Sequence, residues 1–330
     1  MRRSPVRVRV SAQIEVDNKG NAQRTRVSLF SFEEKEFCGI SSVGRALASQ
    51  AEGRGFESRI PLKKKMTTDY QFISSLQNQK VKQIVLLQQK SSERKKSGLF
   101  IVEGLRELRN CVSKGYEIDS LFFCPSLQNE RIEDFNTLHS YEVTEAVYEK
   151  IAYRGSTEGV LAVLRMRHTR LEDLKLPDNP LVVVMESVEK PGNLGAVLRS
   201  ADAAGADAVM VCDPLTDLYN PNLIRSSIGA LFTVPVVSVS SEECISFLKS
   251  LHIRILTAQL QDSELYYHTD MRCGTAIVMG TEATGLTNQW REAADAHIRI
   301  PMLGRLDSLN VSVSAAILLF EAVRQRMGSC

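Results

Sequence analysis

The clearest pattern of apolar and polar positions lies in the C-terminal half of the chain. Residues 181–185 are all apolar, which is typical of a strand that is buried on both faces of a parallel sheet. Apolar residues then recur at the spacing of one helix face, so we expect a helix with Asn193 as its N-cap and Gly205 at its end.

This alternation of strands and helices continues to the end of the chain. About six strands are expected, at residues 181–185, 208–211, 234–239, 253–257, 276–279 and 297–300, with residues 226–230 in a helical stretch. A last helix at 311–326 is apolar on most sides, so we expect it to be buried, between subunits. The pattern predicts an open α/β sheet, whose ligands bind at the carboxyl ends of its strands.

A smaller α/β module is expected at residues 66–167. Its expected strands are 99–102, 118–123, 141–143 and 160–164. Its expected helices are a Gln/Lys-rich segment at 73–87, then 105–112 and 147–152, with Gly98 as a stop signal. Residues 168–180 contain Pro177 and Pro180 and are interpreted as a linker, so the second domain spans 181–330.

The first 65 residues have a different character. The strings SSVGRA at 41–46 and EGRGFESR at 52–59 can be back-translated into sequences that resemble the D-arm and T-arm of a transfer-RNA gene, at about their usual separation. We hypothesise that residues 1–65 are a mis-translated upstream extension and that translation starts at Met66. The alternative is a disordered basic tail that binds RNA. Tryptic peptides from residues 40–60 would contradict the first interpretation.

Composition excludes several classes of protein. No apolar run approaches the roughly 18–20 residues that span a bilayer, so we expect no membrane partner. The 7 cysteines contain no CxxC pair and the 5 histidines show no metal-ligand spacing, so we expect no metal and a cytoplasmic protein with reduced thiols. Neither a GxGxxG turn nor a Walker loop is present, which argues against nucleotide cofactors of those classes.

Charge has to be considered locally. Residues 1–65 carry 14 Lys/Arg and 7 Asp/Glu, whereas residues 171–330 carry 12 and 19. The total of +2 therefore says nothing about a nucleic-acid partner. One cluster in the small module has the residue types that grip phosphates, and it consists of Lys90, Arg94, Lys95 and Lys96. A charged helix end that is merely solvated is the equally open alternative.

Three polar segments follow strands of the larger domain. The first, 193–199, contains Asn193 and Arg199, and Arg199 falls off the apolar face of its helix. The second, 280–286, is a glycine loop that carries Glu282, and the third runs from Ile300 through a loop to Ser308, Leu309 and Asn310. Taken singly, these residues have structural explanations as helix caps and turn residues.

In this order, the three segments resemble the three motifs of the SpoU (TrmH-type) family of RNA 2'-O-ribose methyltransferases, within the SPOUT superfamily. The resemblance covers residues 181–330, and residues 66–167, with Phe100–Gly104 written FIVEG, resemble the L30e-like RNA-binding domain that often precedes it. It implies a SPOUT α/β fold with a C-terminal trefoil knot, a homodimer with the active site near the subunit interface, and structured RNA as substrate. Ribosomal RNA is slightly favoured over transfer RNA.

The resemblance also implies the site residues. Backbone groups around Gly280, Ile300 and Leu309 would hold the cofactor, S-adenosyl-L-methionine. The family pattern gives Arg199 the activation of the ribose hydroxyl, and Asn193, Glu282, Ser308 and Asn310 would orient Arg199 and the ribose. Because a guanidinium stays protonated, we favour phosphate binding and alkoxide stabilisation by Arg199 over proton abstraction. Arg225 and Ser227 are lesser candidates for RNA contact, with a structural role equally open.

Two other functions remain as alternatives. A non-enzymatic RNA-binding protein would explain the basic cluster, but it predicts no binding of S-adenosylmethionine and leaves the conjunction of Asn193, Arg199, Glu282 and Asn310 unexplained. A nicotinamide-dependent oxidoreductase is disfavoured by the missing glycine fingerprint.

Overall fold

The computed structural model describes residues 70–128, 135, 137–153 and 158–328. These belong to one compact unit, Met66–Cys330. The expectations for residues 1–65 lie outside the described residues.

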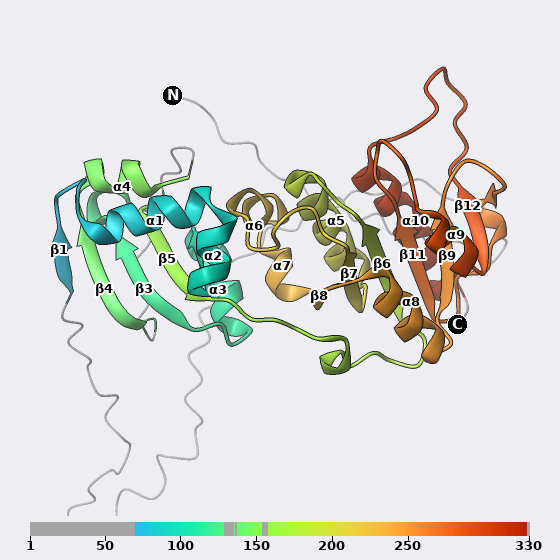
Figure 1. Cartoon of the computed structure of the whole chain (residues 1–330), viewed down its shortest axis with the longest axis horizontal. Coiled ribbons are helices and arrows are strands. Elements are labelled where there is room, and N and C mark those ends of the chain that lie inside the picture. Colours follow the sequence, from blue (N-terminus) through green and yellow to red (C-terminus); the bar gives the residue numbers. More distant parts are fainter. Residues whose placement is uncertain (1–69, 129–134, 136, 154–157, 329–330) are drawn as a thin grey trace, which may run out of the picture. The chain divides into compact units, whose positions relative to one another are not determined.

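The small module is built around a mixed sheet with the strand order β1-β4-β3-β5-β2 (Figure 1, blue to green). The strands are β1 (Gln71–Ile73), β2 (Leu99–Glu103), β3 (Ile118–Phe123), β4 (Thr137–Val143) and β5 (Val160–Arg165). Strands β1, β4 and β3 pair in parallel, whereas β5 is antiparallel to both β3 and β2. Its helical segments are α1 (Gln79–Gln89), α2 (Ser91–Ser97), α3 (Leu105–Ser113), the 3-10 turn η2 (Pro125–Leu127) and α4 (Glu145–Ile151).

The two faces of this sheet are buried differently. Alternate strand residues such as Ile101 and Phe122 pack against α1 and α4 in a core of the module's own. Residues of the opposite face, such as Phe100 and Leu121, belong instead to a core that continues into the second domain.

The second domain contains a parallel sheet with the strand order β10-β12-β9-β11-β6-β7-β8. The strands are β6 (Leu181–Glu186), β7 (Ala208–Cys212), β8 (Val236–Val239), β9 (Arg254–Ala258), β10 (Glu264–Leu265), β11 (Thr275–Met279) and β12 (Ala296–Arg299). Because β11 lies between β9 and β6, loops from both halves of the domain meet at the carboxyl ends of the central strands.

Helices cover both faces of this sheet. They are α5 (Pro191–Ala204), α6 (Pro221–Ser227), α7 (Ala230–Thr233), α8 (Ser241–Ser250), α9 (Asn288–Ala293) and α10 (Val311–Met327), with 3-10 turns η3 (Leu171–Asp173) and η4 (Tyr266–His268). Alternate residues of β6 point to opposite faces of the sheet and belong to two different hydrophobic cores. Leu181, Val183 and Met185 share a core with α5, α6, α7 and α10, whereas Val182 and Val184 share one with α8 and α9.

The structure corrects some expected elements. Ile73 ends strand β1 rather than beginning a helix, and the predicted helical stretch at 226–230 is broken by Ile228 and Gly229, whose φ angles are 53° and 84°. The short strand β10 was not predicted. Helix α10 lies where the pattern predicts it, but it is buried on one side only, because Val313 and Phe320 are about half exposed (46% and 48%).

Candidate functional site

A cavity of about 710 Å³ opens at the carboxyl ends of β9, β11 and β12. It is enclosed by the segments that follow these strands and by the first turns of α10. Gly280, Ile300 and Leu309, the three residues expected to hold a cofactor, all line it. The cavity therefore lies where a parallel sheet of this order binds ligands.

Gly280 permits the tight loop at the end of β11. Thr281 and Gly285 pair across this loop through two backbone hydrogen bonds of 3.2 and 3.1 Å. A Cβ atom on Gly280 would lie only 2.3 Å from the carbonyl carbon of Gly285 and 2.5 Å from its oxygen. Only glycine fits this close backbone approach, so the loop that bounds the cavity depends on it.

Three of the five residues expected to be catalytic meet in a polar cluster beside the cavity. Glu282 Oε1 accepts hydrogen bonds from Asn193 Nδ2 at 2.8 Å and from Asn310 Nδ2 at 3.0 Å. Asn310 Nδ2 also lies 3.2 Å from Asn193 Oδ1. The cluster thus links the first turn of α5, the glycine loop after β11 and the start of α10, which are far apart in the sequence.

Lys190, which lies outside the three motif segments, completes this cluster. Its ammonium group forms an ion pair with Glu282 Oε2. Hydrogen bonds from Lys190 and then from Asn193 hold the pKa of Glu282 below its ordinary value, and the carboxylate raises the pKa of Lys190. A sequence signal existed: Lys190 follows β6, whose carboxyl end lies at the same edge of the sheet.

Asn193 reaches the cluster because it does not cap its helix, which corrects the expectation for this residue. Helix α5 begins at Pro191, with Lys190 in the N-cap position, so Asn193 lies within the first turn. Its amide is therefore available for Glu282. Asn310, by contrast, has both roles, since its Oδ1 accepts from the Ser312 backbone N–H and thereby caps α10.

The other two expected catalytic residues lie outside the cluster. Ser308 lines the cavity and donates to Asp307 Oδ1 at 3.3 Å. Arg199 is exposed and has no hydrogen bond or ion pair with another described residue. It follows Asn193 by six residues, so it lies about 9 Å further along α5 and about 120° around it.

The residues expected to bind RNA differ in exposure. Lys90, Lys95 and Lys96 are exposed, as surface cations should be. Arg94 is not: it is buried, its Nε lies 2.6 Å from Asp217 Oδ2, and its Nη1 donates to Leu87 O at 2.6 Å. The expectation of a surface cation at Arg94 is corrected on this ground, because its guanidinium is already occupied within the protein.

Arg225 and Ser227, the lesser candidates for RNA contact, also differ in exposure. Arg225 is exposed at the end of α6, and its Nη1 donates to the backbone oxygen of Tyr153 at 3.2 Å. Ser227 is buried, and its hydroxyl donates to Ile224 O at 2.8 Å within its own helix. Ser227 therefore has a structural role.

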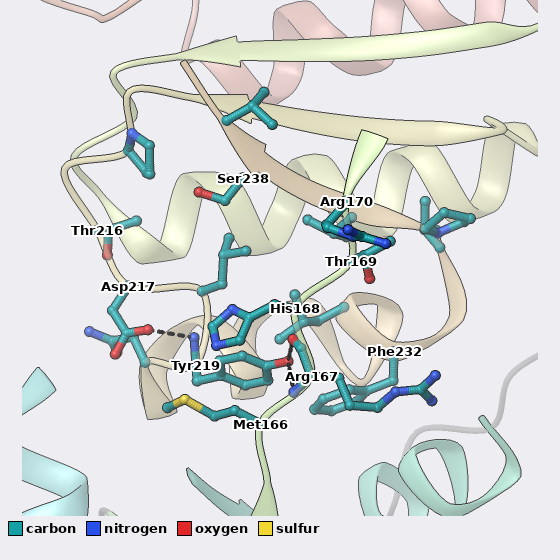
Figure 2. Close-up of a pocket in the computed structure, with 18 of the residues that line it drawn as sticks. Met166, Arg167, His168, Thr169, Arg170, Thr216, Asp217, Tyr219, Phe232 and Ser238 are labelled. Carbon is teal, nitrogen blue, oxygen red and sulfur yellow. Dashed lines mark hydrogen bonds between the residues drawn. The ribbon is translucent and has the colours of Figure 1, made fainter. Parts of the chain in front are cut away.

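A larger cavity, of about 910 Å³, lies beside the linker. None of the residues expected to be catalytic or to bind the cofactor lines it. Figure 2 shows Arg167, at the end of the small module, and His168 of the linker along it, next to Tyr219 and Phe232 of the second domain. The Tyr219 hydroxyl donates to Arg167 O and accepts from Arg167 N. Of the expected site residues, only Lys95 lines this cavity, so we assign the site to the smaller one.

Clusters of metal ligands and membrane-spanning helices are both absent from the described residues. These residues contain no group of three or more His, Cys, Asp or Glu side chains arranged to hold a metal ion. None of the helices in this part of the chain combines the length and apolar character needed to cross a bilayer.

Comparison with family models gives two matches. Residues 180–320 match the SpoU rRNA Methylase family, and residues 78–162 match the MRM3-like substrate binding domain. The first match contains the polar cluster and the 710 Å³ cavity, and the second contains α1 to α4.

Characterised proteins and solved structures agree with these matches. The chain is 30% identical over 248 residues to a 23S rRNA (uridine(2479)-2'-O)-methyltransferase of Streptomyces viridochromogenes, covering 72% of this chain and 86% of that protein. A crystal structure of an RNA 2'-O ribose methyltransferase superposes with a TM-score of 0.69 at 37% identity, covering 78% of this chain and 99% of that one.

One of the similar structures was solved with a cofactor. The SpoU methyltransferase AviRb from Streptomyces viridochromogenes, in complex with AdoMet, superposes with a TM-score of 0.70 at 27% identity. The match covers 77% of this chain and all of that one (100%).

Proposed function

The chain belongs to the SpoU rRNA methylase family, and on that premise we propose that it methylates a ribose 2'-hydroxyl in ribosomal RNA, with S-adenosylmethionine as methyl donor. The observation that carries this proposal is the cluster of Asn193, Glu282 and Asn310 beside a cavity lined by Gly280, Ile300 and Leu309. A polar cluster and an adjoining ligand cavity are what a transfer between two bound substrates requires.

The residues of the cavity fit this cofactor. Backbone groups after β12 and β11 are accessible from the cavity, and Gly280 keeps the loop close enough for contact with a ligand. A relative of the same fold binds AdoMet. When bound, the cofactor supplies an electrophilic methyl group on its sulfonium.

The polar cluster orients the ribose. Hydrogen bonds from Lys190 and Asn193 hold the pKa of Glu282 below its ordinary value, and the carboxylate fixes the amides of Asn193 and Asn310 in one arrangement. These amides offer donors and acceptors to ribose hydroxyls. A rigid arrangement matters because transfer needs the hydroxyl oxygen aligned with the methyl group.

Arg199 acts on the RNA backbone rather than on the cluster. Its exposed guanidinium carries a permanent charge and has no described partner, which suits phosphate binding and stabilisation of a developing alkoxide. Since Arg199 lies away from Glu282 on α5, we propose that the complete site forms in a homodimer, in which a second copy adds to this surface.

The exposed apolar side of α10 supports the homodimer. Val313, Phe320 and Met327 are exposed on this helix (46%, 48% and 76%). Large apolar side chains that gather on one helix side are typical of a subunit interface. Light scattering on the purified chain should give twice the monomer mass, and Phe320→Asp should shift it toward the monomer.

RNA contact is proposed for the surface cations outside the cavity. Lys90, Lys95 and Lys96 are exposed on the small module, and Arg225 is exposed at the end of α6. Residues 171–330 carry 12 Lys/Arg and 19 Asp/Glu, so the catalytic domain alone attracts RNA weakly. The small module therefore supplies much of the affinity for RNA.

The proposed function is tested by methyl transfer from tritiated S-adenosylmethionine to 23S rRNA. The product should resist alkaline hydrolysis at the methylated position, because the blocked 2'-oxygen cannot attack the phosphate. Arg199→Ala should remove transfer while leaving folding and cofactor binding intact. Lys249→Ala is the matched control, because Lys249 is an exposed residue of α8, which packs on the opposite face of the sheet. Unchanged transfer by Arg199→Ala would refute its role, and a wild-type chain that binds no cofactor would refute the proposal.

A further inference from the structure

Two buried polar atoms that belong to lining residues of the 710 Å³ cavity have no hydrogen-bond partner among the described residues. They are Oε1 of Gln259 and Nε of Arg291. Buried polar atoms are nearly always hydrogen-bonded, because leaving one unbonded destabilises the folded protein. One of these atoms accepts and the other donates, so the cavity suits a ligand that offers both kinds of group.

Arg291 is the more informative of the two. It extends from α9 to the glycine loop, where a Cβ on Gly285 would lie 4.0 Å from its Nη2. Its guanidinium forms no hydrogen bond or ion pair with any other described residue, although this group can donate five hydrogen bonds. Arg326 shows the ordinary outcome, because its guanidinium donates to four backbone carbonyls.

The acidic side chains of the cavity do not satisfy Arg291. Glu282 is paired with Lys190 and bonded to two asparagines. Asp307 is exposed and accepts from Ser308. The buried Nε of Arg291 is therefore available to an acceptor from outside the protein, and the positive charge of the guanidinium favours an anionic one.

S-adenosylmethionine offers one anionic group, the carboxylate of its methionine part. Its sulfonium and ammonium groups are cationic and would be repelled by a guanidinium. A carboxylate and a guanidinium instead form paired, charge-assisted hydrogen bonds. We infer that Arg291 binds the carboxylate of the cofactor and so selects the complete cofactor over an adenosine thioether that lacks the amino-acid part. This inference rests on the proposed function.

Calorimetry on the full chain with three probes tests the inference. The probes are S-adenosylmethionine, S-adenosylhomocysteine and 5'-methylthioadenosine, and only the last lacks the carboxylate. Arg291→Ala should weaken binding of the first two by about 10- to 100-fold, the range expected for hydrogen bonds between charged groups, and should leave 5'-methylthioadenosine unchanged. Arg291→Lys keeps the charge but not the forked pair of hydrogen-bond donors. Its affinity for S-adenosylmethionine should therefore lie between those of wild type and Arg291→Ala.

Arg299→Ala is the matched control, because Arg299 lines the same cavity but its Nη1 contacts Ser263 Oγ at 3.5 Å. Three outcomes overturn the inference: equal weakening of all three probes by Arg291→Ala, no weakening of any, or a carboxylate-selective loss in Arg299→Ala instead. Reduced RNA affinity with unchanged cofactor affinity would also overturn it, since Arg291 would then serve the RNA. A wild-type chain that binds none of the probes refutes the proposed function itself, so the two failures are distinguishable.

Discussion

Lys190 lowers the pKa of Glu282. The hydrogen bond from Lys190 is the largest of the effects that lower the pKa of Glu282, so removing it should raise that pKa toward the ordinary value. The negative charge of such a carboxylate is lost by protonation only as the pH falls through the lowered pKa. In Lys190→Met, the acidic limb of the pH profile for methyl transfer should therefore move to higher pH.

Lys249→Met provides the comparison for this profile, since Lys249 is an exposed lysine on α8 and away from the cluster. Its acidic limb should coincide with that of wild type. If Lys190→Met also leaves the limb in place, the ionisation of Glu282 does not limit the reaction.

A substitution at Gly280 tests whether the 710 Å³ cavity binds the cofactor. A valine here would place its Cβ 2.3 Å from the carbonyl carbon of Gly285, so the loop after β11 must open or shift. We expect Gly280→Val to abolish measurable binding of S-adenosylmethionine in calorimetry. Gly304→Val is the control, because no atom lies within 4 Å of a Cβ at that glycine in the neighbouring loop. Equal binding by the two variants would remove Gly280 from the proposed site.

At the scale of single residues, the sequence predicted part of the site. The motif resemblance selected Asn193, Glu282 and Asn310, which meet in the structure. It did not include Lys190, although the position of this residue after β6 was a signal, and it could not select Arg291, whose importance comes from neighbours that are distant in the sequence. Burial of a charged residue is equally invisible in a local pattern, as the exposed position expected for Arg94 illustrates.

At the scale of elements, the close contact of α5 and α6 depends on Gly195. A Cβ on this residue would lie 1.9 Å from Ser226 Oγ and 2.8 Å from the backbone N of Ser227. Forcing a methyl group into this contact should destabilise Gly195→Ala by about 1–3 kcal/mol, as overpacking usually does. Urea denaturation, followed by circular dichroism, measures the change.

Gly192 lies in the first turn of the same helix, and a Cβ there meets no atom within 4 Å. Gly192→Ala should therefore leave the free energy of unfolding nearly unchanged. A loss of the same size in both variants would mean that helix flexibility, and not the contact with Ser226, explains the effect.

Apolar runs predicted most elements because they record burial directly. Strand β3 has the predicted bounds, and β6 and α10 differ from them by a residue at the end. The failures involve short or broken elements. Strand β10 has 2 residues and β1 has 3, too few to show a period, and the break between α6 and α7 depends on a positive φ at Ile228.

At the scale of the whole molecule, the two domains share one hydrophobic core. Phe100 of the small module lies 4.4 Å from Tyr219 and 6.0 Å from Phe232 of the second domain, measured between ring centroids. Tyr116 packs edge-on against Phe232 at 5.3 Å. The apolar character of these residues indicates that they are buried. The alternation of residues along a strand, however, shows only which face of the sheet a side chain occupies, so a core shared by two domains could not be predicted.

A buried ion pair between Arg94 of the small module and Asp217 of the second domain also connects the two domains. Side-chain exposure is 3% for Arg94 and 11% for Asp217, so neither charge is well solvated. Arg94→Met would leave the Asp217 carboxylate buried without its partner, and breaking such a pair typically costs about 3–5 kcal/mol. We expect a loss of that size in the free energy of unfolding, measured in urea.

A second substitution separates the lost pair from the unpaired charge. Adding Asp217→Asn to Arg94→Met removes the buried charge and should recover part of the stability, whereas Asp217→Asn alone should destabilise the wild-type chain. Lys95→Met and Lys96→Met, at exposed neighbours of Arg94, should instead weaken RNA binding in a salt-dependent manner without changing stability. If Arg94→Met behaved like these two variants, Arg94 would be free to contact RNA in solution, and the junction would not depend on the ion pair.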